Sequence, residues 1–193
     1  MSRTGLSYNE AIKLGNLDAL ILAHQEGYEW NKSTCRVAAR NGHLECLRYL
    51  HEEGCLWSAE SCDIAATQGE LECLQYLCDN GCPYDETTMW AAARSGHLDC
   101  LKYLHKHGCE WDKGVTQIAA MRGHLNCLKF AIENGCKWDK GVTQIAAMRG
   151  HLNCLKFAIE NGCEWDERVY EVAKAKGHIE CVEYLAELIT PAS

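Results

Sequence analysis

The sequence has little proline and no excess of positive charge. Only Pro83 and Pro191 occur among its 193 residues, so nothing predicts a proline-rich linker or a disordered tail. Lysine and arginine number 19 against 27 aspartates and glutamates, which gives a formal net charge of -8. Phosphate backbones bind basic surfaces, so this balance argues against nucleic acid as the main partner, although a local basic patch is compatible with it.

Long apolar runs are also missing. No stretch approaches the roughly 18 consecutive apolar residues of a membrane-spanning helix. The first residues are not followed by the apolar core of a secretion signal, and the run at 20–23 is too short for one. We therefore expect a soluble cytoplasmic protein, or one of the host cytoplasm or nucleus if the chain is viral, with no membrane partner.

Glycine, by contrast, is abundant and regularly spaced. Seven glycines are each 27 residues apart: Gly15, Gly42, Gly69, Gly96, Gly123, Gly150 and Gly177. Residues 111–136 recur letter for letter as 138–163, which a recent duplication, natural or engineered, explains. The period predicts a single domain of seven repeats, at about 3–29, 30–56, 57–83, 84–110, 111–137, 138–164 and 165–189.

Each unit is predicted to form two helices. In unit 30–56, Asn31 is a plausible N-cap for a helix over 32–41, and Gly42 ends that helix because glycine adopts left-handed dihedrals cheaply. Apolar residues at three- and four-residue spacing then mark a second amphipathic helix that ends at Gly54. Helices this short do not stand alone, so the units must stack and share one core.

The two ends of the array differ from its middle. Alanine pairs such as Ala38-Ala39 and Ala65-Ala66 keep the first helices thin enough for close stacking, but the last unit has Ala173-Lys174. Asn16 replaces the histidine that follows the glycine in most units. These departures are typical of polar terminal caps, so we expect a complete solenoid.

The segment 37–47, Val-Ala-Ala-Arg-Asn-Gly-His-Leu-Glu-Cys-Leu, resembles the core of an ankyrin repeat. The short Gly-Cys repeats of this kind in protists and giant viruses are similar. The resemblance covers nearly the whole chain and implies a scaffold that binds proteins. The ankyrin period is about 33 residues, and the six missing here fall where ankyrin repeats have a β-hairpin. We therefore predict an all-α, ankyrin-like solenoid with little or no hairpin.

Fourteen cysteines suggest a disulfide framework or a metal site, but the repeat favours another interpretation. Most occupy two recurring positions, those of Cys46 and Cys55, where ankyrin-like repeats have buried valine and alanine. Free cysteine packs as a small hydrophobe, and cysteines in the same position of successive repeats should be too far apart to bridge. Cys78 with Cys82, and then Cys35 with Cys62, are the pairs to check.

Two other recurring residues have structural and functional interpretations. The histidines at position 43 and its equivalents could form a metal ladder or a pH sensor, but a hydrogen bond to backbone in the same or the next repeat is favoured. The aromatic residues at position 57 and its equivalents could cage a methylated lysine, but they more simply fill the space of the missing hairpin. No phosphate loop, metalloprotease motif or nucleophile elbow is present, so we expect no enzyme, cofactor or bound metal.

The positions that vary most between repeats predict the functional surface. They lie on the first helices, and in an ankyrin-like stack they line the concave groove. Trp90 stands out because its position is polar in every other repeat, so its ring should be at least partly exposed and is a binding hot-spot candidate. The predicted partner-binding residues are Arg36, Arg40, Asp63, Thr67, Trp90, Arg94, Gln117, Met121, Arg122, Gln144 and Met148.

We therefore expect a monomeric scaffold that binds a protein or peptide. Two alternatives remain open. One is a metal- or redox-responsive protein that uses its thiols, and the other is a structural or engineered array without a partner.

Overall fold

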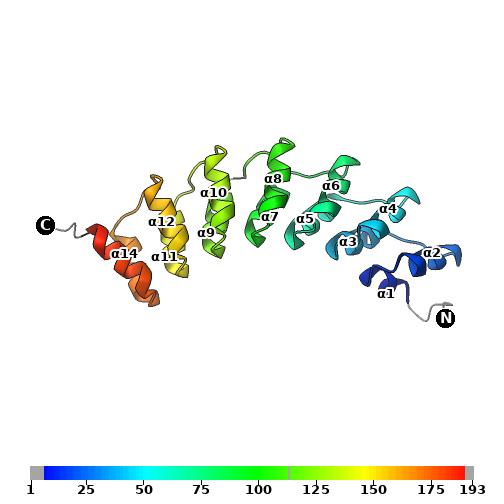
Figure 1. Cartoon of the computed structure of the whole chain (residues 1–193), viewed down its shortest axis with the longest axis horizontal. Coiled ribbons are helices and arrows are strands. Elements are labelled where there is room, and N and C mark those ends of the chain that lie inside the picture. The colour runs from blue at the N-terminus through cyan, green and yellow to red at the C-terminus, as the bar shows by residue number, and fades with distance from the viewer. Residues whose placement is uncertain (1–6, 113, 190–193) are drawn as a thin grey trace.

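The computed structural model describes residues 7–112 and 114–189, and these residues form helices and loops without a strand. The helices follow one another as seven short antiparallel pairs (Figure 1). Their bounds are α1 (Tyr8–Lys13), α2 (Leu17–Gln25), α3 (Lys32–Arg40), α4 (Leu44–Glu52), α5 (Ala59–Gln68), α6 (Leu71–Asp79), α7 (Glu86–Ser95), α8 (Leu98–Lys106), α9 (Val115–Arg122), α10 (Leu125–Glu133), α11 (Val142–Arg149), α12 (Leu152–Glu160), α13 (Glu167–Lys176) and α14 (Ile179–Ile189).

In the second pair, the first helix begins after the predicted N-cap and ends at Arg40, one residue earlier than predicted. Asn31 caps α3 by accepting a hydrogen bond from the Ser33 backbone N–H, and Asp85 caps α7 in the same way. Gly96 ends α7 with a φ of 81°, a left-handed backbone conformation that residues other than glycine rarely adopt. The chain then turns at once into the second helix, so the two helices of a pair stay in contact.

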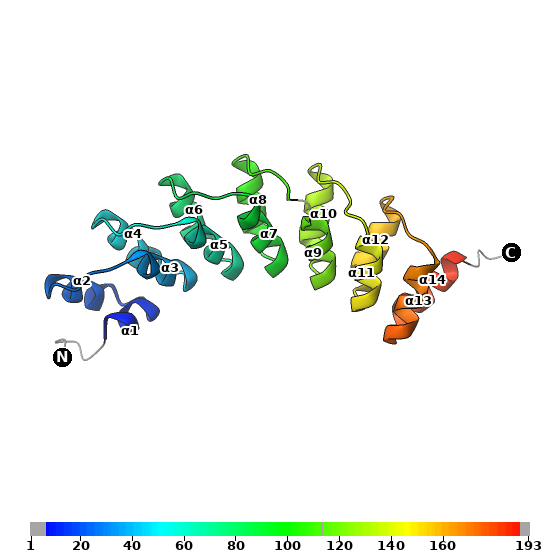
Figure 2. The same ribbon diagram turned by 180° about the vertical axis from the view of Figure 1, so that it is seen from behind.

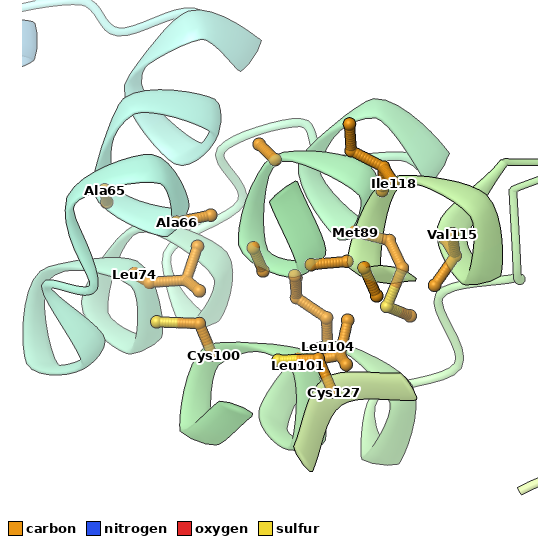
Figure 3. Packing of buried hydrophobic residues seen from close by; sticks show 14 of the residues in the cluster. Ala65, Ala66, Leu74, Met89, Cys100, Leu101, Leu104, Val115, Ile118 and Cys127 are labelled. Carbon is orange, nitrogen blue, oxygen red and sulfur yellow. The ribbon is translucent and has the colours of Figure 1, made fainter. Parts of the chain in front are cut away.

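The core runs continuously from pair to pair. In the second helices the inward side is apolar, as at Cys46, Leu47 and Leu50 of α4, which are at most 1% exposed. Figure 3 shows how consecutive pairs meet, with Ala66 of α5 and Leu74 of α6 beside Cys100 of α8. Alanines at these first-helix positions are fully buried, which brings neighbouring pairs close together.

The stack is arched, and its two faces differ. Figures 1 and 2 show the seven pairs in a single row, with the first helices toward the inside of the arch. Consistent with this curvature, neighbouring first helices contact each other more extensively than neighbouring second helices do. We call the surface of the first helices on this side the inner face.

Candidate partner-binding face

The structure buries none of the eleven predicted partner-binding residues. Six are exposed and five are half-buried, and all lie on five consecutive first helices. The exposed ones are Arg36, Arg40, Arg94, Gln117, Arg122 and Gln144, and the half-buried ones are Asp63, Thr67, Trp90, Met121 and Met148. The stack therefore aligns positions that are 27 residues apart into one continuous surface.

Trp90 lies near the middle of this surface, on α7. Its ring is half-buried and packs against the core, whereas the neighbouring Met89 is fully buried. The guanidinium carbon of Arg94, one turn later, lies 5.3 Å from the ring centroid of Trp90, a cation–π geometry. Trp90 is thus anchored on one side and accessible on the other.

Asp63 and Thr67 form side-chain hydrogen bonds within the fold. The Thr88 hydroxyl donates a 2.5 Å hydrogen bond to the Asp63 carboxylate, and the Thr67 hydroxyl donates to the Asp63 carbonyl oxygen at 2.7 Å. Burial raises the pKa of Asp63 despite the bond from Thr88. Asp63 and Thr67 are therefore occupied by intramolecular hydrogen bonds and less available to a partner than their neighbours.

The charged residues of the predicted set are four arginines and one aspartate. Arg36 is paired with Glu60 at 2.9 Å across neighbouring helices. In the described part of the chain, Arg40, Arg94 and Arg122 form no ion pair. The inner face is therefore locally basic, although the chain as a whole is acidic.

Among the clefts in the described part of the chain, two lie between repeats. The smaller one, of about 330 Å³, is lined by Met121, Arg122, Arg149 and His151, so it lies where α9 and α11 end. The larger one, of about 760 Å³, lies between the loops before α11 and α13, with Trp138 and Trp165 in its lining. It includes Gln144 from the predicted set. Its other residues follow from the shape of two adjacent loops, which the repeat pattern alone does not specify.

The recurring histidines join neighbouring repeats. His97 donates from Nε2 to the Thr67 carbonyl oxygen at 3.1 Å, and His124 donates to that of Arg94 at 3.2 Å. His43, His151 and His178 make the equivalent bond. The bonds run to the preceding repeat, whereas the sequence suggested the same or the next one. Burial lowers the pKa of His124.

The recurring aromatic residues fill the space between the loops and the second helices. The Trp57 ring stacks on His51 at a centroid distance of 3.8 Å and meets Tyr76 edge-on. The indole N–H groups of Trp111 and Trp138 donate to the carbonyl oxygens of Asn134 and Asn161, each at 3.1 Å. These contacts support the space-filling interpretation over a cage for a methylated lysine.

The cysteines are free thiols, and all except the half-buried Cys78 are buried. Their contacts differ from the sequence-based pairing. The Sγ atoms of Cys35 and Cys55 lie 2.9 Å apart, and the neighbouring Cys78 and Cys82 thiols raise the pKa of Cys62. Comparing cysteines within one repeat position misses these contacts, because they join two different positions of the same unit. Among the described residues, no group of three or more His, Cys, Asp or Glu side chains is arranged to hold a metal ion.

Comparisons with known proteins agree with this architecture. The family model for ankyrin repeats (3 copies) matches residues 38–115 and again residues 116–191. The chain belongs to the ankyrin repeat family. Its fold is similar to that in the crystal structure of the human ASB11 ankyrin repeat domain, with a TM-score of 0.70 and 21% sequence identity over 82% of this chain and 84% of that one. No curated protein matches the sequence.

Ankyrin repeats are generally protein–protein interaction modules and typically have no catalytic activity. The family therefore agrees with a binding role at this coarse level. Within the described residues, no helix combines the length and apolar character needed to cross a bilayer.

Proposed function

We propose that this ankyrin repeat chain binds a protein or peptide partner along its inner face, with Trp90 at the centre. The observation that carries the proposal is the half-buried ring of Trp90, flanked by Arg94, at a position where the two following repeats have glutamine. Tryptophan and arginine are the residues most enriched in binding hot spots, and they act best when anchored by surrounding packing.

The chemistry of the inner face suggests what kind of segment it binds. Met121 and Met148 continue the apolar surface from Trp90 on the next two repeats, and both are half-buried. Methionine adapts to different apolar partners because its side chain is unbranched and polarisable. Arg40, Arg94 and Arg122 add positive charge along the same surface. We infer a segment with an apolar or aromatic anchor flanked by aspartate or glutamate.

A display selection tests this proposal. A random peptide library is selected on the immobilised chain, with counter-selection on the Trp90→Gln variant. Glutamine already occupies the equivalent positions 117 and 144, so this substitution should leave the fold intact. We expect enriched peptides with an apolar anchor and acidic flanks that do not bind the variant. Peptides that bind both proteins equally, or binding of nucleic acid alone, would overturn the proposal.

A further inference from the structure

Two positions 20 residues apart face each other within a repeat. One is in the first turn of the first helix, and the other follows the glycine that ends the second helix. In the first pair the facing residues are Tyr8 and Tyr28, whose rings stack with centroids 4.6 Å apart. In the second pair they are Cys35 and Cys55, with the Sγ atoms 2.9 Å apart. The facing of these positions is thus a property of the repeat.

Only two repeats place cysteine at both positions. The first position is Cys35 and Cys62 in these repeats but Met89, Thr116 and Thr143 in the next three. The second position is cysteine throughout this stretch. It is occupied by Cys55, Cys82, Cys109, Cys136 and Cys163. The chain therefore contains two adjacent facing thiol pairs and three equivalent thiols without a facing thiol.

We propose that Cys35 with Cys55, and Cys62 with Cys82, are two redox-active dithiols that a hydroperoxide converts to disulfides inside the folded repeats. The geometry of the Cys35–Cys55 pair carries the inference. An S–S bond is about 2.05 Å long, so the two sulfur atoms have less than about 1 Å to close. Both side chains are held in place, since Cys35 is fully buried and Cys55 is 3% exposed. Cys62 and Cys82 occupy the equivalent positions one repeat later, and both are buried, at 0% and 2% exposed.

The two thiols of each pair have different roles. The Cys35 thiol donates a hydrogen bond to the Cys55 sulfur and lowers the pKa of Cys55, although burial opposes this. The neighbouring Cys62 thiol likewise lowers the pKa of Cys82. Since the thiolate is the nucleophilic form, Cys55 and Cys82 are the sulfurs that react first. Cys35 and Cys62, whose pKa values are raised, react second.

The reaction with hydrogen peroxide balances in two steps. The Cys55 thiolate attacks one peroxide oxygen, the O–O bond breaks, and the departing hydroxide takes up a proton to become water. The Cys55 sulfur is then a sulfenic acid, which Cys35 attacks to form the S–S bond while the hydroxyl leaves as a second water. Two thiols lose two electrons and the peroxide gains them. The disulfide joins the loop after α4 to the first turn of α3.

The Cys62–Cys82 pair has an additional neighbouring thiol that is more accessible. Cys78 of α6 is half-buried and is close enough to Cys62 to raise the pKa of the Cys62 thiol. A disulfide between Cys62 and Cys78 converts to one between Cys62 and Cys82 when the Cys82 thiolate attacks Cys62 and releases Cys78. The Cys62–Cys82 pair thus has a neighbouring thiol near solvent, Cys78, through which it can be oxidised.

Disulfide mapping on the folded chain tests this inference. The reduced protein is treated with a small excess of hydrogen peroxide, alkylated with N-ethylmaleimide in denaturant, digested and analysed by mass spectrometry. We expect linked peptides for Cys35–Cys55, and for Cys62 with Cys82 or Cys78. Cys109, Cys136 and Cys163 should remain reduced and be alkylated, because the residue that faces each of them carries no thiol. The oxidised protein should also unfold at a higher Tm, since each bond closes a loop in the unfolded chain.

The chain itself supplies matched control variants. Cys35→Thr and Cys62→Thr introduce the residue that occupies the same position at 116 and 143, and Cys35→Met introduces that at 89. Each should fold and lose only its own disulfide and the corresponding rise in Tm. The inference is wrong if Cys55 is still a free thiol after peroxide treatment and is therefore alkylated. It is equally wrong if Cys109, Cys136 and Cys163 are oxidised as readily as Cys55, or if the linkages form only in denaturant.

Discussion

His97 donates a hydrogen bond from Nε2 to the carbonyl oxygen of Thr67, thirty residues earlier and in the preceding helix pair, at 3.1 Å. Four other histidines repeat this bond at the same separation. A residue that links one repeat to the one before it contributes to the interface between them, and such interfaces stabilise a solenoid in which single repeats do not fold.

Removing this link should lower stability. We expect His97→Ala to reduce the free energy of unfolding by about 1–2 kcal/mol, because the variant loses the hydrogen bond and the ring contacts across the interface. Urea unfolding followed by circular dichroism measures the change. His107→Ala is the control, because the exposed imidazole of His107 hydrogen-bonds to the carbonyl oxygen of Tyr103 in α8 of the same helix pair and packs on the Tyr103 ring, so its loss should cost less than about 0.5 kcal/mol. Equal losses for the two variants would contradict this role of His97.

Alanine substitutions at two glycines with the same backbone conformation separate the cost of a left-handed backbone from the cost of a steric clash. Gly96 and Gly108 both have a φ of 81°. A Cβ at Gly96 would lie 2.5 Å from Nδ1 of His124, whereas a Cβ at Gly108 would meet nothing within 4 Å. Gly108→Ala should therefore cost about 1–2 kcal/mol from the left-handed backbone alone, and Gly96→Ala at least about 1 kcal/mol more.

Comparing the urea midpoints of these two glycine variants checks the prediction. The double variant Gly96→Ala/His124→Ala should be less unstable than the sum of its two single variants, because the colliding ring is gone. Additive losses would show that the ring and the glycine do not interact.

A buried hydroxyl offers a gain in stability. Ser61 is fully buried, and in the described part of the chain its Oγ has no hydrogen-bond partner. The equivalent residues two and three repeats later are Val115 and Val142. Ser61→Val should raise the free energy of unfolding by about 1 kcal/mol, since an unpaired buried polar group is replaced by an apolar one.

The control for Ser61 is one repeat later. Thr88→Val removes a hydroxyl at the same position that does have a partner, the Asp63 carboxylate, so this variant should lose about 1 kcal/mol. Thermal melts of the two variants should move in opposite directions. A loss of stability in both would contradict the assignment of an unpaired hydroxyl to Ser61.

The half-buried histidine at position 124 predicts a pH dependence. Burial lowers its pKa in the folded chain below the 6.5 of the unfolded chain, despite the bond to Arg94. As the pH falls through 6.5 the unfolded state takes up the proton first, so stability that is present at higher pH is lost, until the folded state is protonated too. Urea unfolding at pH 7.5 and pH 5.5 should show a larger loss for the wild type than for His124→Gln. An equal or smaller loss of stability in the wild type than in His124→Gln would contradict this role of His124.

The sequence predicts the helices well because their signals are local. The N-cap at Asn31, the stop at Gly42 and the buried side of α4 each depend on residues within a few positions of one another. The absence of a strand among residues 7–112 and 114–189 is compatible with the missing hairpin that the 27-residue period predicts.

The contacts between and across repeats were harder to predict. The direction of the His97 bond depends on how far each helix pair is displaced along the stack, and the period does not specify that displacement. The approach of Cys35 to Cys55 joins two positions that the repeat presents separately, so searching each column of cysteines does not find it. The exposure of Trp90, in contrast, follows from the polar residues at its equivalent positions, because the stack gives equivalent residues similar surroundings.

The affinity of the Trp90→Gln variant for a peptide tests most directly whether a partner binds the inner face. A peptide obtained by the display selection is titrated by calorimetry into the wild type, Trp90→Gln and the control Leu56→Gln. Leu56 is an exposed apolar residue, 68% accessible, in the loop between α4 and α5 and outside the first helices. We predict that Trp90→Gln weakens binding about 30-fold, which corresponds to about 2 kcal/mol, while Leu56→Gln leaves the Kd unchanged. An unchanged Kd for Trp90→Gln, with Tm values equal to that of the wild type, would place the partner elsewhere on the chain.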